Sequence, residues 1–235
     1  MEIHIGSEKG SDIHPLVSRG TAKTYFTRKA AIALAISGIL FVVYPSLRPF
    51  SDETSLSGAA AFASTEWIVS HTVAILAFVL MTIGLFGLCV ALQDTIVEKL
   101  SLQGLVLIVF GTGLTLPFYG AEVFGLNAIG QEALNRQNID LVSLANVIRF
   151  GPGFFMILGG LIIVGAGSVI TAIAIWKSRI MSPWSGIPFA FGILMYLPQF
   201  MGTQPIRVAH GVILAVGCVW IGAGVWRQNQ KKMNR

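Results

Sequence analysis

Residues 67–92, WIVSHTVAILAFVLMTIGLFGLCVAL, contain no Asp, Glu, Lys or Arg and are long enough to cross a lipid bilayer as one helix. A crossing needs about 20 predominantly apolar residues, because an α-helix rises about 1.5 Å per residue. Five further stretches are also predominantly apolar and long enough to cross: Ala30–Leu47, Leu102–Phe124, Leu144–Trp176, Trp184–Met201 and Val208–Trp226. With Trp67–Leu92 they predict an all-α integral membrane bundle of six transmembrane helices.

The composition excludes a water-soluble domain. Hydrophobic residues make up 54% of the 235 residues and charged residues only 11%, whereas soluble domains carry about 25% charged residues. The net charge of +5 does not come from a basic stripe interleaved with aromatic residues, the pattern typical of nucleic-acid binding. The sequence therefore predicts the lipid bilayer as a partner and no nucleic acid.

Basic residues predict the orientation of the bundle, because Lys and Arg gather in cytoplasmic segments. Six spans place both termini and every second loop on one side. That side holds 12 of the 16 Lys and Arg residues, whereas the other holds only Arg48, Arg136, Arg149 and Arg207. We therefore expect a plasma-membrane protein with both termini cytoplasmic. Its expected parts are a cytoplasmic tail (1–29), a six-span domain (30–226) and a basic cytoplasmic tail (227–235).

A short pattern recurs at the outer ends of the spans. The second, fourth and sixth spans carry Val, any residue and then a basic residue, and the first, third and fifth spans carry proline near their outer ends. The basic residues are His71, Arg149 and His210, and the prolines are Pro45, Pro117 and Pro198. This pattern favours three tandem helical hairpins, and transporters often contain such internal repeats with binding sites at the repeat interface.

Polar residues at one depth of the bundle form the candidate site. An ionisable group near hydrocarbon is costly and therefore indicates a function by default, and a paired charge costs far less there than a lone one. Glu122 is the only carboxylate expected near the hydrocarbon boundary, which makes Arg149 its expected partner. The expected ligand-binding residues are His71, Tyr119, Glu122, Arg149, Gln199, Arg207 and His210.

Three interpretations of this cluster stay open. In the first, an outward-facing cavity binds or transports a small polar or anionic molecule, with Arg149 and Arg207 on its carboxylate or phosphate. In the second, His71 and His210 are the axial ligands of haem b in a membrane electron-transfer protein. In the third, the cluster is a structural staple in a non-catalytic accessory subunit.

No enzyme signature accompanies these residues. The sequence lacks a nucleophile elbow, a phosphate-binding loop and a dinucleotide fingerprint, so we expect a protein that is not an enzyme and has no cofactor, the haem alternative apart. A zinc site from the two histidines and Glu122 is weaker, because no spacing places two of these ligands on one helix. Cys89 and Cys218 lie at different depths and are expected to be free thiols.

Three stretches resemble bacterial multi-pass membrane proteins of unassigned function, a family of six-span proteins. They are Tyr44–Glu53 (YPSLRPFSDE), Leu116–Gly125 (LPFYGAEVFG) and Leu197–Phe200 (LPQF). The likeness is a general one over most of the chain after residue 30. It implies a bacterial plasma membrane, and it implies neither an activity nor catalytic residues.

Overall fold

The computed structural model describes the backbone from His14 to Met233 and the side chains of residues 22–230. All regular elements in this part of the chain are helices, which confirms the all-α prediction. They are α1 (His14–Leu47), α2 (Leu56–Ala63), α3 (Thr65–Ala91), α4 (Glu98–Gly120), η1 (Ala121–Gly125), α5 (Leu126–Arg136), η2 (Ile139–Ser143), α6 (Leu144–Phe150), α7 (Pro152–Ser178), η3 (Pro183–Ser185), α8 (Gly186–Leu194), η4 (Pro198–Met201) and α9 (Gln204–Met233).

Five helices among the described residues are long and apolar enough to cross a membrane. Their outward faces carry large apolar side chains that the fold leaves exposed, among them Ile36, Ile83, Val109, Ile162 and Val216. A water-soluble protein rarely exposes such extensive apolar surface. The five candidate spans are Ala22–Leu47, Thr65–Ala91, Glu98–Arg136, Pro152–Ser178 and Gln204–Gln230.

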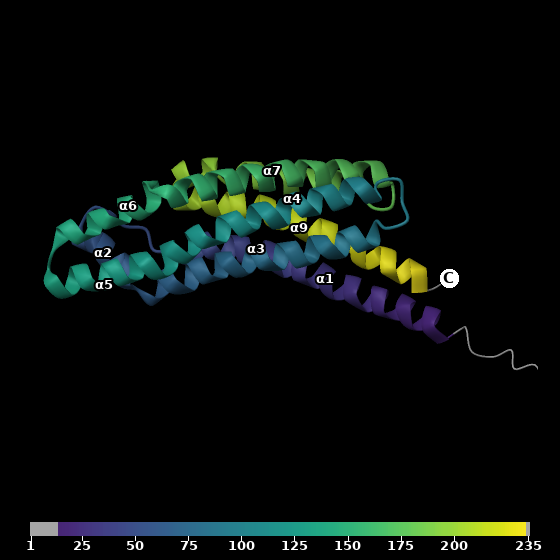
Figure 1. Cartoon of the computed structure of the whole chain (residues 1–235), viewed down its shortest axis with the longest axis horizontal. Coiled ribbons are helices and arrows are strands. Elements are labelled where there is room, and N and C mark those ends of the chain that lie inside the picture. Colours follow the sequence, from purple (N-terminus) through teal and green to yellow (C-terminus); the bar gives the residue numbers. More distant parts are fainter. Residues whose placement is uncertain (1–13, 234–235) are drawn as a thin grey trace, which may run out of the picture.

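The main helices form a closed ring in chain order. Each of α1, α3, α4, α7, α8 and α9 packs against the next, and α9 packs against α1. The expected hairpins correspond to the packed pairs α1–α3, α4–α7 and α8–α9, although an internal repeat stays a prediction. Figure 1 shows the start of α1 and the end of α9 at one end of the molecule, and α2, α5 and α6 at the other.

The predicted span Trp184–Met201 is not one helix, which corrects the expectation of six uniform spans. It consists of η3, the nine-residue α8, a turn and η4. Proline has no backbone N–H, so Pro198 cannot donate to the carbonyl of Leu194, and the α-helix ends at Leu194. The segment α8 packs between α7 and α9 and runs against both, since Gly186 approaches Ala172 of α7 and Gly192 approaches Leu214 of α9.

Two other expected spans have different limits. The predicted span Leu144–Trp176 divides into α6 and α7 at Gly151, whose backbone is extended and which precedes Pro152. The α-helical conformation is disfavoured for a residue before proline, which explains why the helix breaks at Gly151. The span that was expected to end at Phe124 continues through η1 and α5 to Arg136, 39 residues in all. At about 58 Å, this helix is nearly twice as long as the hydrocarbon core is thick, about 30 Å.

Helix also extends into both expected tails. The first helix begins at His14, inside the segment 1–29 that was expected to be loosely ordered, and α9 continues to Met233. Pro15 stands in the first turn of α1, where proline fits a helix. The expected tail residues 1–13 and 234–235 lie outside the described residues.

The helices α2, α5, η2 and α6 form a cap over one end of the ring (Figure 1). The cap has its own small apolar core, which includes Phe62, Trp67, Leu126 and Val142 and is separate from the core of the ring. The α1–α2 loop and α6 bring charged side chains to the boundary between cap and ring. This boundary is where the candidate site lies.

Candidate functional site

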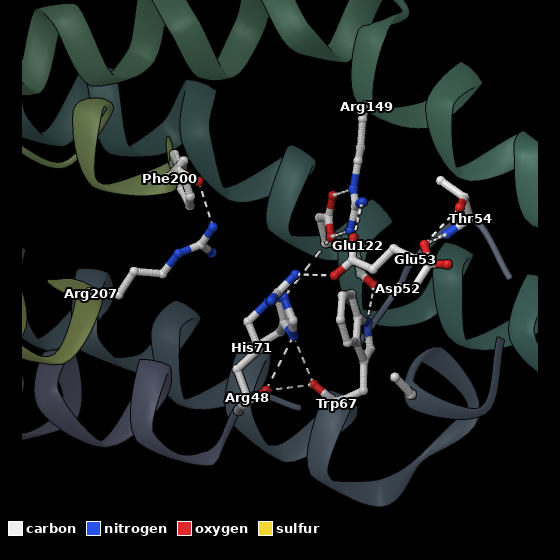
Figure 2. A network of polar contacts seen from close by, with 12 residues as sticks. Arg48, Asp52, Glu53, Thr54, Trp67, His71, Glu122, Arg149, Phe200 and Arg207 are labelled. Carbon is white, nitrogen blue, oxygen red and sulfur yellow. Dashed lines mark hydrogen bonds and ion pairs between the residues drawn. The ribbon is translucent and has the colours of Figure 1, made fainter. Parts of the chain in front are cut away.

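A cavity of about 480 Å³ lies at the capped end of the ring. Its wall comes from α1, the loop that follows α1, α3, α4, η1, α6, α7, η4 and α9. Side chains from these segments point toward one another in Figure 2. Five of the seven expected site residues line the cavity: His71, Tyr119, Glu122, Arg149 and Arg207.

Arg149 extends into the cavity from α6 and lies between two carboxylates (Figure 2). Its Nε and Nη2 donate to the two carboxylate oxygens of Glu122 at 2.7 and 3.1 Å, and its Nη1 donates to Glu53. Glu53 also accepts a hydrogen bond from Nη2 of Arg48 at 2.6 Å. The expected Glu122–Arg149 pair is confirmed, within a chain of alternating charge that runs from Arg48 through Glu53 and Arg149 to Glu122.

Glu122 owes its position to a π-helical bulge. The bulge, Ala121–Gly125, continues α4 shortly after Pro117, and the N–H of Leu126 bonds the carbonyl of Ala121 five residues back. A π-bulge shifts the register of a helix by one residue and is frequent at functional sites. The indole Nε1 of Trp67 donates to the backbone carbonyl of Glu122 at 2.7 Å, which anchors the bulge to α3.

His71 faces the same carboxylate from α3. Its Nδ1 lies 2.8 Å from the carbonyl oxygen of Trp67, and because a carbonyl only accepts, Nδ1 carries the hydrogen. Its Nε2 then points a lone pair toward Oε2 of Glu122, 4.0 Å away. A hydrogen-bond donor on a bound ligand would satisfy both of these acceptors.

Sequence reasoning missed Arg48 and Glu53, and with Glu53 it missed a second carboxylate near the boundary. Both lie in the turn that follows α1, where Asp52 accepts hydrogen bonds from the N–H and hydroxyl of Thr54 at 3.1 and 2.6 Å. These bonds also lower the pKa of Asp52. The available signal was an Arg and a Glu of opposite charge directly after an apolar span.

The charges in this part of the site stabilise one another. Burial by itself raises the pKa of Glu53, but the nearby guanidinium groups of Arg149 and Arg48 outweigh burial and hold this pKa below its usual value. Burial lowers the pKa of Arg149, and the bonds to Glu122 and the charge of Glu53 reverse this effect and raise it. Both carboxylate partners therefore hold Arg149 in its charged form.

Arg207 lies apart from this chain of charges, on the first turn of α9 (Figure 2). Its Nε donates to the carbonyl of Gly202 at 2.9 Å, and its Nη2 donates to the carbonyl of Phe200. Among the residues that the structure describes, no carboxylate forms an ion pair with it. An arginine has five N–H donors, so three N–H groups of Arg207 are not used by these two carbonyls.

The ring of Phe50 contacts two arginines that line the cavity, Arg48 and Arg207. The guanidinium carbon of Arg48 lies 4.9 Å from the centre of the Phe50 ring, and that of Arg207 lies 5.2 Å from it. The two guanidinium groups are therefore no more than about 10 Å apart, and both line the cavity. A small ligand in the cavity can reach both.

Gln199 and His210, the other two expected residues, do not line the cavity. Gln199 is buried in η4. Nε2 of His210 lies 2.6 Å from the carbonyl oxygen of Gly192 and bonds α9 to α8. These two residues were expected at the depth of the site, but their side chains do not face the cavity.

A layer of buried aromatic side chains closes the cavity on the side of the ring's core. Tyr44, Phe78, Tyr119 and Tyr196 are each at most 5% exposed. The hydroxyl groups of Tyr119 and Tyr196 are 2.6 Å apart, which links α4 to the turn after α8. Tyr119 lines the cavity and belongs to the apolar core of the ring, and Tyr196 belongs to the same core.

The charges that line the cavity do not cancel. Three arginines and two glutamates line it, which leaves one positive charge when His71 is neutral. Nothing in the described residues groups three or more His, Cys, Asp or Glu side chains in a way that could hold a metal ion. The arrangement therefore suits an anion better than a cation or a metal.

No protein-family model matches the chain, and no curated protein or solved structure is significantly similar to it.

Proposed function

We propose that this protein crosses the plasma membrane six times, with both termini in the cytoplasm, and binds a small anion in the cavity at its outer end. The fifth of these crossings is the broken segment η3–α8–η4. The support for this crossing is geometric. Both α7 and α9 start beside the cavity, so the chain that leaves the far end of α7 must return to the cavity end before α9 begins. The excess of basic residues at the opposite end supports the orientation.

The observation that carries the binding proposal is Arg207. Arg149, which was expected to hold the anion, is instead paired with two carboxylates, Glu122 and Glu53, which neutralise its charge. Arg207 instead donates hydrogen bonds only to backbone carbonyls among its described neighbours, has N–H groups that these carbonyls do not use, and lines the cavity. A guanidinium group binds carboxylate and phosphate through paired hydrogen bonds, which makes these the expected head groups.

The surroundings of Arg207 strengthen the attraction for an anion. Half-buried charges interact through a lower effective dielectric than charges in water, so one excess positive charge has a larger effect in a cavity than on an open surface. Arg48, which also lies against the Phe50 ring, adds a second positive charge, although Glu53 neutralises part of it. We assign the head group to the space between Arg207 and Arg48.

Passage across the membrane requires a second conformation. In the proposed orientation, the aromatic layer with the Tyr119–Tyr196 hydroxyl pair lies on the cytoplasmic side of the cavity. Tyr196 follows α8 on the broken crossing, just after the regular α-helix has ended. We place the transport step, if the protein releases the anion inward, at a movement of this segment.

The haem alternative lacks a comparable observation. His71 lines the cavity and His210 does not, and Nε2 of His210 is already bonded to the carbonyl of Gly192. The accessory-subunit alternative remains testable, because a purely structural cluster predicts that Glu122→Gln lowers stability and leaves anion binding in the remaining folded protein unchanged.

The test is the thermal stability of the purified protein in detergent with acetate, phosphate or a sulfonate, at constant ionic strength to hold screening fixed. Binding to the folded state raises the melting temperature. We expect a rise for the wild type, a smaller rise for Arg207→Lys and none for Arg207→Gln, whereas the exposed control Arg136→Gln behaves as wild type. Equal rises in all four proteins would overturn the proposal.

A further inference from the structure

The cavity has an apolar half that binding of a small inorganic anion does not use. Phe154 and Ile157 from the start of α7 form one wall, and Leu197 and Phe200 from around η4 form the other. Arg207 lies next to this half, since its guanidinium group bonds the carbonyl of Phe200 and lies 5.8 Å from the centre of the Phe200 ring. A positive charge therefore stands at the edge of an apolar slot.

The slot reaches the lateral surface of the bundle. Phe150 lines the cavity and is nevertheless 70% exposed, so the cavity opens beside it. In the described part of the chain, α7 packs on α4 and α8, and it has no extensive contact with η4 or α9. We therefore place the opening at the capped end of the ring, between the start of α7 and η4.

The rim of this gap is apolar on both sides. Phe155 on α7 is 72% exposed and Met201 at the end of η4 is 94% exposed. Both lie within a few residues of where a candidate span begins, at Pro152 and at Gln204, which places the rim near the boundary of the hydrocarbon. An opening to water would favour polar side chains, whereas large exposed apolar side chains favour contact with lipid chains.

We infer that the ligand is an amphiphilic anion, a phosphate or carboxylate head on a hydrocarbon chain, which enters from the outer leaflet between α7 and η4. This inference rests on the proposed function and specifies its ligand. The head binds Arg207 and Arg48, and the chain lies along Phe154, Ile157 and Leu197. The cavity of about 480 Å³ suits a head group and the first part of a chain, with the remainder in the bilayer.

Charge and depth agree with this assignment. A lipid of the outer leaflet carries its head at the membrane surface, the level of Arg207, and its chain points toward the membrane centre. Ile157 lies three residues, almost one turn, farther along α7 than Phe154, on the way into the membrane. Each methylene group that leaves water contributes about 0.8 kcal/mol, so a chain adds affinity that a bare anion lacks.

The experiment compares dodecyl phosphate with inorganic phosphate on protein reconstituted in discs of zwitterionic lipid, after subtraction of the uptake by protein-free discs. We expect dodecyl phosphate to bind at least about tenfold more tightly than inorganic phosphate. Phe154→Ala should weaken dodecyl phosphate alone, and Arg207→Gln should weaken both ligands. Phe155→Ala, at the exposed neighbouring position, is the matched control and should bind both as wild type does.

The outcomes separate the two proposals. If inorganic phosphate binds as tightly as dodecyl phosphate and Arg207→Gln weakens it, the lipid-like ligand is wrong and the proposed anion site stands. If neither ligand binds, or if Arg207→Gln leaves both affinities unchanged, the anion site itself is wrong and the further inference fails with it. Equal losses in Phe154→Ala and Phe155→Ala would place the chain outside the slot.

Discussion

At the scale of single residues, the site depends on how buried charges are matched. Arg149 makes three hydrogen bonds to two carboxylates, whereas Arg207 meets backbone carbonyls. The Glu122–Arg149 pair could be predicted from the sequence, because the two charges were expected at one depth and a buried charge needs a partner. Glu53 could not, since it lies in a turn without periodicity that only the folded chain directs into the cavity.

The first prediction concerns this matching. Glu122→Gln should lower the free energy of unfolding by up to about 3 kcal/mol, because the buried charge of Arg149 then keeps only one of its two carboxylate partners. Glu132→Gln, in the solvent-exposed pair with Arg136, should cost less than about 1 kcal/mol. Denaturant titration of both variants in the same detergent gives the comparison, and equal losses would contradict the matching described for Arg149.

The second prediction concerns pH. Because the charges of Arg149 and Arg48 hold the pKa of Glu53 below its usual value of 4.5, the ionised carboxylate stabilises the folded state above that value. This stabilisation is lost as the pH falls through the lower pKa of the folded state. We expect acidification from neutral pH to below 4.5 to lower the melting temperature of the wild type more than that of Glu53→Gln.

The exposed Glu66 provides the control for this pH experiment. Glu66→Gln removes a carboxylate without touching the cavity and should retain the acid sensitivity of the wild type. A wild-type melting temperature that falls no more steeply than that of Glu53→Gln would show that Glu53 is not stabilised by its arginine neighbours.

At the scale of helices, long apolar stretches predicted where the chain crosses, but they did not predict where helices end. A helix continues past the hydrocarbon boundary when no residue stops it, as Glu98–Arg136 does. Proline alone does not decide where a helix ends, since α8 stops before Pro198 whereas the helix Glu98–Arg136 continues past Pro117. The sequence also did not predict the direction in which His210 and Gln199 point, because depth along a helix does not determine which neighbour a side chain contacts.

The third prediction concerns the contact between α4 and α7. A Cβ atom on Gly160 would lie 2.7 Å from the carbonyl oxygen of Gly111, closer than a real Cβ atom approaches. Gly160→Ala should therefore separate the helices and cost about 1–3 kcal/mol of stability, as other overpacked sites do. Gly159→Ala is the matched control, because nothing lies within 4 Å of a Cβ atom at Gly159.

Thermal unfolding of the two alanine variants measures this contact. Gly159→Ala should unfold at or slightly above the wild-type temperature, because alanine favours a helix more than glycine does. If Gly160→Ala were as stable as Gly159→Ala, the close approach of α4 and α7 would not exist in the folded protein.

At the scale of the whole molecule, the cap lies at one end of the ring, and the start of α1 and the end of α9 lie at the other (Figure 1). The fourth prediction tests the orientation. In a variant with both buried cysteines replaced by alanine, Asn135→Cys in α5 should react with an impermeant maleimide on intact cells. Ile96→Cys, in the exposed turn between α3 and α4, should react only after the membrane is opened. The reverse pattern would place the cavity on the cytoplasmic side.

The ring, the cap and the cavity together support the proposal of a single function at the capped end of the bundle. The central claim is that an anion binds between Arg207 and Arg48, and the most direct measurement is a crystal structure with bromoacetate, in which the anomalous signal of bromine locates the ligand. We predict a bromine peak inside the cavity beside Phe50, with the carboxylate on Arg207. Bromine peaks only outside the cavity, under conditions in which bromoacetate raises the melting temperature, would contradict the account.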